Sequence, residues 1–475
     1  MELDKDLAAR QEARLLCRQA EQAQKRLAAM SQGQLDAIVE AVAKAFSAAA
    51  VELASMASKE TGFGNTEDKT MKNRFASETV ASSIRGMKCV GVLKEPAGEK
   101  LWEVGVPVGV IAAIVPSTNP TSTVCYKALI ALKSGNAIVF SPHPKALECT
   151  LRAARIVAAA AEGAGAPPGS VACLSMAAMA GTEELMKAEE VRLILATGGP
   201  GMVRAAYSSG KPAIGVGAGN GPAYIHHSAN VKQALACIAR SKSFDYGTVC
   251  ASEQSIIVEK TMENAVREEA KRQGFYFMNT QEAGQLAKLL FKPNGTLNPQ
   301  IVGKPAKSLA EMAGFLVPKD TCVLVAREQE AGPTRPYSME KLCPVLAFFV
   351  MDSEDAVLEK AVEVLEHEGS GHTFAIHAED RAVVRKFALQ IPVSRFLVNT
   401  PAALGGIGAT TELFPALTLG CGAVGGSSSS NNISPMDLIN IRRVAWDIGE
   451  KTEEKPCVDN DLVEILTAKI LERLK

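Results

Sequence analysis

The stretch GVIAAIVPSTNP at residues 109–120 decides the expected fold, because no polar residue interrupts its aliphatic run from 110 to 115. A short apolar run of this kind, ended by a Pro- and Ser-containing turn, is typical of a parallel strand that helices cover on both faces. This alternation of strand and helix continues downstream and predicts a doubly wound α/β sheet, whose ligands lie beyond the carboxyl ends of the strands. Further strands are predicted at 136–140, 171–174 and 191–196, and helices at 123–133, from the turn at 142–144 to about 162, and at 182–188.

The sequence on either side extends this pattern. Residues 1–60 have helical periodicity with a break near 31–33. The segment KPAIGVGAGNGPAYI at 211–225 is dense in glycine, which indicates close approach of the backbone to a ligand or to another element. A second series of strands and helices predicts a second α/β domain of similar size, with segments at 255–258, 261–273, 280–290, 321–326, 345–350, 353–366 and 381–388.

A candidate nucleophile, Cys250, lies in SKSFDYGTVCASE at residues 241–253. It is placed between small and hydroxylated residues, after an aromatic-Gly turn and before the apolar run 255–258, as expected for a thiol at the mouth of a strand. A free cysteine, however, usually behaves as a small buried hydrophobic residue, and the chain has 11 cysteines. Local context therefore leaves both interpretations of Cys250 open.

Composition excludes several classes of protein. With 47% hydrophobic and 22% charged residues, the chain is typical of a globular protein, and its net charge of -1 gives no indication of a nucleic-acid partner. The charged N-terminal sequence has no apolar signal core, and no apolar run approaches the roughly 20 residues of a membrane span. The cysteines include no CxxC pair, and HEGSGH at 367–372 spaces its histidines wrongly for a helical zinc motif. We therefore expect a cytoplasmic protein with reduced thiols and no metal.

Two segments near the end of the chain each allow two interpretations. The stretch TLGCGAVGGSSSSNN at 418–432 is either a linker or a flexible segment that wraps a site. After a polar joint at 450–456, residues 459–475 are predicted to form an amphipathic helix, with one apolar stripe of Val463, Leu466, Ile470, Leu471 and Leu474. That helix either docks on its own domain or binds another protein.

Four motifs, in this order along the chain, resemble those of the aldehyde dehydrogenase superfamily over residues 1–447. Asn119 in PSTNP is similar to the family's oxyanion asparagine, and residues 197–199, TGG, to its glycine turn on the cofactor side. Cys250 falls where the catalytic thiol is expected, and Glu340 in EKLCPV resembles the glutamate that holds the nicotinamide ribose. The chain is most similar to the CoA-acylating branch, which interconverts aldehydes and acyl-CoA with NAD and CoA.

Two departures from the hydrolytic members favour this branch. Hydrolytic members carry a water-activating glutamate before the thiol, whereas residues 215–219 contain no carboxylate and Val216 takes the corresponding position. Water, with a pKa of about 15.7, needs such a base, while a thiol of pKa about 8.5 is partly ionised without one. The second departure is Ser141, where many hydrolytic members have a lysine on the adenosine ribose. SPHP at 141–144 and GHT at 371–373 both resemble the acylating branch.

The resemblance implies a mechanism. The Cys250 thiolate attacks the aldehyde, Asn119 and the Cys250 backbone N–H hold the oxyanion, and CoA takes up the acyl group after hydride transfer to NAD. His372 is either a proton-handling group or a structural histidine. NADP remains an alternative cofactor, and the alternative functions are a hydrolytic aldehyde dehydrogenase and a catalytically silent scaffold. The implied cofactor-binding residues are Ser141, Pro142, His143, Thr197, Gly198, Gly199, Gly217, Glu340 and Leu342.

The resemblance also implies an organisation and partners. We expect a dimer or tetramer acting on a short-chain aldehyde such as acetaldehyde or propionaldehyde. The terminal helix is similar to those that target some acylating enzymes to the protein shell of a bacterial microcompartment, which places the expected site of action there. The expected divisions are a cofactor-binding domain at 1–226 with an oligomerisation arm at 91–108, a thiol domain at 227–426, a return arm at 427–447, and a joint with the terminal helix at 448–475.

Overall fold

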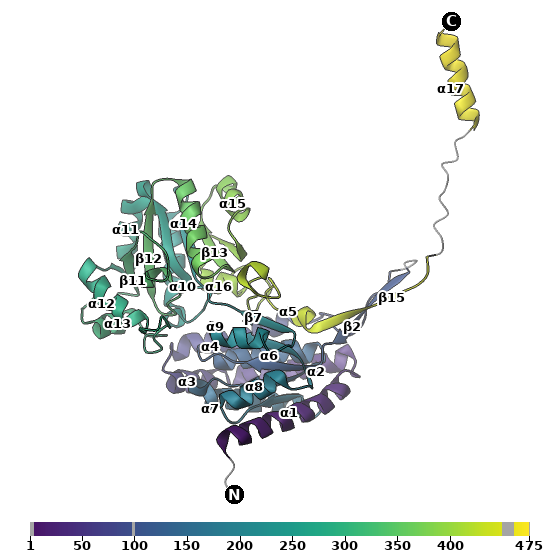
Figure 1. Ribbon diagram of the computed structural model, residues 1–475, viewed down its shortest axis with the longest axis horizontal. Coiled ribbons are helices and arrows are strands. Elements are labelled where there is room, and N and C mark those ends of the chain that lie inside the picture. The colour runs from purple at the N-terminus through teal and green to yellow at the C-terminus, as the bar shows by residue number, and fades with distance from the viewer. Residues whose placement is uncertain (1–3, 97–99, 449–459, 475) are drawn as a thin grey trace.

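The chain folds into two α/β domains, each built on a parallel sheet, and a small antiparallel arm (Figure 1). The computed structural model describes residues 4–96, 100–448 and 460–474. The two α/β domains with parallel sheets confirm the predicted fold class.

The first sheet has the strand order β5-β4-β3-β6-β7, and all its neighbouring pairs are parallel. The stretch that predicted the fold forms β3 at the centre of this sheet, where every residue of the strand is buried. Central burial on both faces explains why its sequence is an uninterrupted aliphatic run. The strands are β3 (Val110–Ile114), β4 (Ala137–Ser141), β5 (Val171–Cys173), β6 (Val191–Thr197) and β7 (Ala213–Val216).

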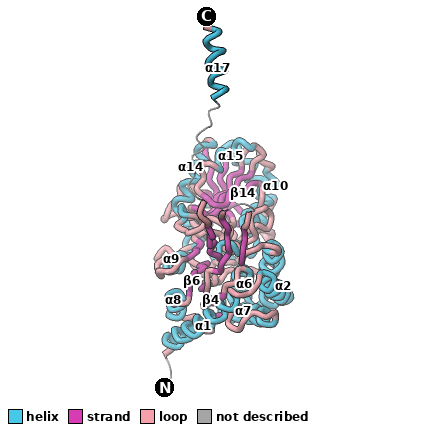
Figure 2. The backbone as a smooth tube through the Cα atoms, turned by 90° about the vertical axis from the view of Figure 1, so that its right-hand side faces the viewer, coloured by secondary structure: helices cyan, strands magenta, loops and turns pink. Residues whose placement is uncertain are grey.

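Helices cover both faces of this sheet. Helices α2, α6 and α7 pack against one another, and α1 packs against α8; Figure 2 shows β4 and β6 between α8 on one side and α2, α6 and α7 on the other. The predicted break near residue 31 is a helix start, because Ser31 and Gln34 form a capping box. The helices are α1 (Lys5–Leu27), α2 (Gln32–Ala48), α3 (Ala50–Thr61), α4 (Thr66–Arg74), α5 (Val80–Ile84), α6 (Pro120–Lys133), α7 (Leu147–Gly163), α8 (Met179–Lys187) and α9 (Pro200–Tyr207).

The second sheet has the order β10-β11-β12-β9-β8-β13-β14. Along β12, Leu346 and Phe348 belong to one apolar cluster, whereas Ala347 and Phe349 belong to another. Because successive residues of a strand point to opposite faces, both faces of this sheet are covered. The strands are β8 (Gly221–Ile225), β9 (Glu253–Glu259), β10 (Phe275–Phe277), β11 (Val323–Arg327), β12 (Val345–Met351), β13 (Gly371–His377) and β14 (Val393–Val398). The helices are α10 (Val231–Ser243), α11 (Glu263–Arg272), α12 (Thr280–Leu290), α13 (Ala306–Ala313), α14 (Glu354–His367), α15 (Arg381–Ala388) and α16 (Ala402–Gly406).

The chain passes between the two sheets earlier than the expected boundary at residue 226. Strand β8 belongs to the second sheet, where it pairs with β9 and β13. The expected division placed β8 in the first domain because a short buried strand does not reveal which sheet it joins. Later in the chain, Leu419, Ile433 and Leu438 pack into the core of the first domain.

The expected oligomerisation arm at 91–108 and the expected return arm at 427–447 pair with each other. Strands β1 (Gly91–Lys94), β2 (Leu101–Pro107) and β15 (Ile439–Ala445) form an antiparallel sheet in the order β1-β2-β15, which projects from the first domain (Figure 1). Helix α17 (Asn460–Arg473) lies apart from both domains in Figure 1. The predicted polar joint at 450–456 lies outside the described residues. Among the helices of the described residues, none combines the length and apolar composition needed to cross a membrane.

Candidate active site

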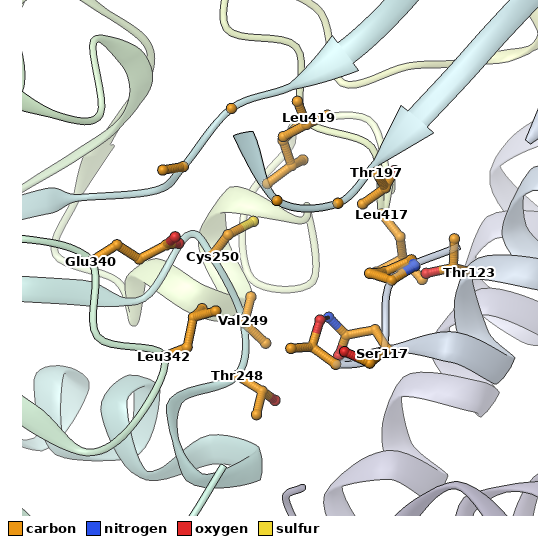
Figure 3. Close-up of a pocket in the computed structure, with 18 of the residues that line it drawn as sticks. Ser117, Thr123, Thr197, Thr248, Val249, Cys250, Glu340, Leu342, Leu417 and Leu419 are labelled. Atoms are coloured by element: carbon orange, nitrogen blue, oxygen red, sulfur yellow. Dashed lines mark hydrogen bonds between the residues drawn. The ribbon is translucent and has the colours of Figure 1, made fainter. Parts of the chain in front are cut away.

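A cavity of about 210 Å³ lies where the two domains meet, and residues from both line it. Figure 3 shows Glu340 and Leu342 on one side and Ser117 and Thr123 on the other, with Cys250 and Val249 between them. Of the residues predicted to form the site, the cavity is lined by Cys250, Asn119, His143, Thr197, Gly198, Gly199, Gly217, Glu340 and Leu342.

Cys250 lies on the turn between the short helical segment Phe244–Gly247 and β9. The glycine-dense segment runs against its backbone, since a Cβ on Gly219 would lie 1.9 Å from the Cys250 carbonyl oxygen. This contact explains one glycine of the segment by close approach. Burial, with Glu340 as the next cause, raises the pKa of Cys250 to about 12. The thiol is therefore protonated at neutral pH in the ligand-free protein.

Asn119 is the N-cap residue of α6, on the turn after β3, and its side chain makes no capping hydrogen bond to the helix. Its side-chain Oδ1 accepts a hydrogen bond from Lys72 Nζ at 2.5 Å. Its Nδ2 donates one of its two N–H groups to Thr118 Oγ1, at 3.3 Å. The amide therefore has donor capacity left on a side chain that lines the cavity.

The predicted glycine turn joins β6 to α9. Thr197 ends β6, and its Oγ1 is buried without a hydrogen-bond partner among the described residues. A Cβ on Gly199 or on Gly217 would meet no atom within 4 Å, so the cavity is open at both positions. Gly199 is the N-cap of α9, whose first turn presents backbone N–H groups. A hydroxyl, open glycines and a helix N-terminus together form a polar recess suited to a phosphate or ribose.

Glu340 and Leu342 lie on the loop that precedes β12. Glu340 Oε1 accepts a hydrogen bond from the Gly219 N–H at 2.9 Å. Burial, followed by the nearby Glu368, raises the pKa of Glu340 to about 8. At neutral pH this carboxyl is largely protonated. Leu342 has a φ of 41°, a left-handed backbone conformation that is uncommon for a residue with a side chain.

Three of the predicted site residues do not line the cavity. Ser141 ends β4, and its Oγ lies 2.7 Å from Thr182 Oγ1 in the domain interior; Pro142 follows it. His372 is buried in β13, with its Nδ1 2.8 Å from Thr373 Oγ1. Burial, and then Arg395, lower the pKa of His372 to about 3. A neutral histidine away from the cavity favours the structural interpretation of this residue.

The structure adds lining residues that the sequence did not indicate. Lys72 on α4 and Thr248 on the Cys250 turn line the cavity, as do Leu417 and Leu419 from the segment after α16. Leu419 belongs to the stretch 418–432, which therefore contributes to the cavity wall. The sequence did not indicate Lys72 as a site residue, because a lysine in the charged segment TEDKTMKNR is typical of a solvent-exposed helix.

Comparison with known proteins agrees with this geometry. Residues 4–274 match the aldehyde dehydrogenase family. The chain is 44% identical over 436 residues to the bifunctional aldehyde-alcohol dehydrogenase of Escherichia coli, covering 90% of this chain and 49% of that protein. It is 34% identical to the acetylating succinate-semialdehyde dehydrogenase of Clostridium kluyveri, covering 91% of this chain and 95% of that protein.

Solved structures extend the comparison. An acetylating aldehyde dehydrogenase from Geobacillus thermoglucosidasius superposes with a TM-score of 0.93 at 50% identity, covering 94% of this chain and 99% of that one. A propionaldehyde dehydrogenase from a fucose-utilisation bacterial microcompartment of Clostridium phytofermentans gives 0.82 at 28% identity, covering 90% and 96%. The chain spans about half the length of the E. coli protein. It spans nearly the full length of the C. kluyveri and G. thermoglucosidasius enzymes. On both the sequence and the structural matches, the chain belongs to the aldehyde dehydrogenase family.

Proposed function

We propose that the protein is a CoA-acylating aldehyde dehydrogenase, which converts an aldehyde, CoA and NAD into acyl-CoA and NADH through a thioester on Cys250, and runs the reverse reaction as well. The observation that carries this proposal is the composition of the cavity. It brings together a thiol, an amide donor and a polar recess, yet Glu340 is the only carboxylate among its described lining residues.

The cavity residues fit a nicotinamide dinucleotide. The unpartnered Thr197 Oγ1 and the open positions at Gly199 and Gly217 provide a polar recess beside the thiol. Glu340 would hold the ribose of the nicotinamide end, Leu342 would support that end, and His143 lines the same cavity. When bound, the cofactor supplies a hydride acceptor.

The chemistry of the chain's own residues then follows. The Cys250 thiol first gives up its proton to solvent, and the resulting thiolate attacks the carbonyl carbon of the aldehyde, forming a C–S bond and an oxyanion. The Asn119 amide and the Cys250 backbone N–H donate to that oxyanion. Loss of hydride from the adduct restores the C=O bond and leaves the acyl group on Cys250 as a thioester. The CoA thiolate attacks this thioester, and the C–S bond to Cys250 breaks to return the free thiolate.

The choice of CoA over water rests on the missing base. Val216 lines the cavity where hydrolytic members carry their glutamate, and an apolar side chain takes no proton from water. Glu340 is a poor substitute, because its carboxyl is largely protonated at neutral pH and accepts from Gly219. CoA brings a thiol that needs less help to ionise.

Product analysis tests the proposal. The wild-type protein with acetaldehyde and NAD is expected to release acyl-CoA when CoA is present, and to form little carboxylate when CoA is absent. Cys250→Ala is expected to lose at least about 10,000-fold in rate, as removal of a nucleophile does. The matched control is Cys237→Ala on α10, since Cys237 is outside the cavity lining. Carboxylate as the main product would identify a hydrolytic enzyme, and an inactive protein that binds no NAD would identify a silent scaffold.

Cofactor and substrate choice belong to the same proposal. We propose NAD as the main cofactor, with NADP as the alternative, and a short-chain aldehyde as the substrate. One relative's solved structure is described as containing NADP+, and another as containing propionyl-CoA. Rates with NAD and NADP, and with aldehydes of two to six carbons, decide both points.

The antiparallel arm supports a proposed dimer or tetramer. On β2 and β15 the side chains of Leu101 and Ile441 are exposed, as is Trp446, which follows β15. Exposed apolar side chains on a projecting sheet are a typical interface between copies of a chain. Light scattering of Ile441→Arg against wild type tests it, with a smaller assembly expected.

We also propose that α17 directs the protein to a bacterial microcompartment by binding a shell protein. Leu466, Ile470 and Leu471 are each more than half exposed, and they share one stripe of the helix. The contact expected for a helix docked on its own domain is not seen among the described residues. Support from relatives is indirect, since the C. phytofermentans enzyme is a microcompartment protein at 28% identity.

A further inference from the structure

Lys72 on α4 is a buried cation in the cavity wall whose contacts are all to the protein. Its Nζ lies 2.5 Å from Asn119 Oδ1, 2.5 Å from Asp245 Oδ2 and 3.1 Å from Thr248 Oγ1. An ammonium group has three N–H donors, and these three contacts use them all. Lys72 is therefore not built to bind a substrate, although it lines the cavity.

The contact between Lys72 and Asn119 determines how the oxygen and the NH2 group of the Asn119 amide are oriented. An ammonium group only donates, so the amide atom 2.5 Å from it is the carbonyl oxygen. The opposite end of the amide is then the NH2 group, which is the donor that an oxyanion needs. Without Lys72, the orientation of this amide would depend on the longer hydrogen bond from Nδ2 to Thr118 Oγ1, at 3.3 Å.

Asp245 balances the charge of Lys72 and fixes its position. The Asp245 side chain is fully buried, and its Oδ2 also accepts from Lys69 Nζ at 2.9 Å. Its Oδ1 accepts from the Asn65 N–H, and its backbone N–H donates to Asp68. Burial acts to raise the pKa of Asp245, but Lys72 and Lys69 together lower it below its usual value. The carboxylate is thus a fixed anchor, held by the N-terminal part of α4.

The anchor and the nucleophile belong to one short segment. Asp245 and Thr248 precede Cys250 on the same turn, and Asp245 has a left-handed φ of 47°. Thr248 Oγ1 also donates to Asp245 Oδ2, at 2.7 Å. Lys72 therefore connects the Asn119 turn of the first domain to the Cys250 turn.

We infer that Lys72 is a positioning residue, which holds the Asn119 amide as an oxyanion donor and fixes that donor relative to the Cys250 turn. The inference rests on the proposed function, since it assumes that an oxyanion forms at Cys250. It differs from a purely structural role, because it predicts that Lys72 acts through Asn119.

Lys69 provides a matched control. It is as buried as Lys72, lies on the same helix and shares Asp245. Its other contact is the Thr118 backbone oxygen at 2.9 Å rather than the Asn119 amide. Lys72→Met and Lys69→Met each leave one lysine paired with Asp245, so both are expected to fold and to lose similar thermal stability. Only Lys72→Met removes the partner of Asn119 Oδ1.

The test is the single-turnover burst of NADH with acetaldehyde and NAD in the absence of CoA. The burst reports thioester formation alone, so it does not depend on whether CoA or water later accepts the acyl group. Lys72→Met is expected to slow the burst about 100-fold with little change in the apparent affinity for NAD, as loss of one oxyanion donor does. Lys69→Met is expected to slow it less than about fivefold.

A double-variant cycle decides whether the effect passes through Asn119. Asn119→Ala with Lys72→Met is expected to be no more than about threefold slower than Asn119→Ala alone. Effects that multiply, or equal losses for Lys72→Met and Lys69→Met, would overturn the inference. Should Lys72→Met fail to fold, Lys72→Leu, which also has no donor for Asn119 Oδ1, takes its place in the same cycle.

A wild-type protein that gives a burst but releases carboxylate would refute CoA acylation and leave this test intact. A wild-type protein without any burst would refute the proposed function itself. A crystal structure of the Lys72 variant then judges the inference: a rotated or disordered Asn119 amide is expected, and an unchanged one would overturn it.

Discussion

The cavity contains a buried polar side chain without a hydrogen bond, whereas helix α17 carries apolar side chains that nothing covers. In the cavity wall, the hydroxyl of Thr197 is buried without a hydrogen bond among the described residues. On α17, Leu466 and Ile470 are apolar and more than half exposed. A buried polar group costs free energy until something bonds to it, and exposed apolar surface gains free energy when something covers it. The first situation suits a small polar ligand and the second suits a protein surface.

The Asp245 cluster beside the cavity shows the opposite condition, since each of its charges has a partner. Asp245→Asn would leave Lys69 and Lys72 buried with a neutral neighbour. We expect the free energy of unfolding to fall by about 3–5 kcal/mol, the usual cost of breaking a buried ion pair. Urea denaturation measures it. The control is Asp355→Asn, whose carboxylate is 76% exposed and pairs with Lys386, and which should cost less than about 1 kcal/mol. Equal losses in the free energy of unfolding for the two variants would show that the buried Asp245 pairs stabilise the protein no more than an exposed ion pair does.

The pH dependence of cofactor binding tests the carboxyl of Glu340. Its pKa is raised to about 8, so the carboxyl is mostly neutral at pH 7 and ionised at pH 9. If the ionised form holds the ribose hydroxyls, the apparent Kd for NAD falls about tenfold between these two pH values, because the competent fraction rises by that factor. Calorimetric titration measures this change. Glu340→Gln should bind more weakly and lose the dependence; a variant that keeps it would assign the titration to another group.

Thr197→Val tests the unpartnered hydroxyl directly. Since the Oγ1 makes no hydrogen bond to the described residues, its loss should not lower the melting temperature of the free protein. Binding of NAD is expected to weaken about fivefold, the equivalent of one hydrogen bond of about 1 kcal/mol. Thr197→Ser, which keeps the hydroxyl, is the control. A destabilised Thr197→Val with normal NAD affinity would mean that the hydroxyl serves the fold instead.

Sequence patterns predicted the fold, because a buried parallel strand such as β3 needs an aliphatic run. The cavity residues were less visible in local patterns: the context of Cys250 left two interpretations open, and Asn119 and Glu340 were identified only by the resemblance to the aldehyde dehydrogenase superfamily. Other features depend on tertiary contacts that have no local pattern. Lys72 is buried only because Asp245 lies opposite it, and β8 reveals its sheet only through its neighbours. His372 resembles a turn histidine in sequence, but it lies inside β13.

A substitution in the apolar stripe of α17 is expected to have the smallest effect on catalysis. It therefore tests whether the helix and the cavity act independently. Ile470→Gln is expected to leave kcat within about twofold of wild type, because the described side chains of this helix are exposed and away from the cavity. Co-sedimentation with purified microcompartment shell proteins is expected to be lost, since one polar group placed in an apolar helix–groove contact is costly. Lys469→Gln, on the neighbouring exposed position, should keep that binding. A fall in kcat or in melting temperature for Ile470→Gln would instead mean that α17 packs on the body of its own chain, and its exposed leucines would then mark an internal contact rather than a partner's site.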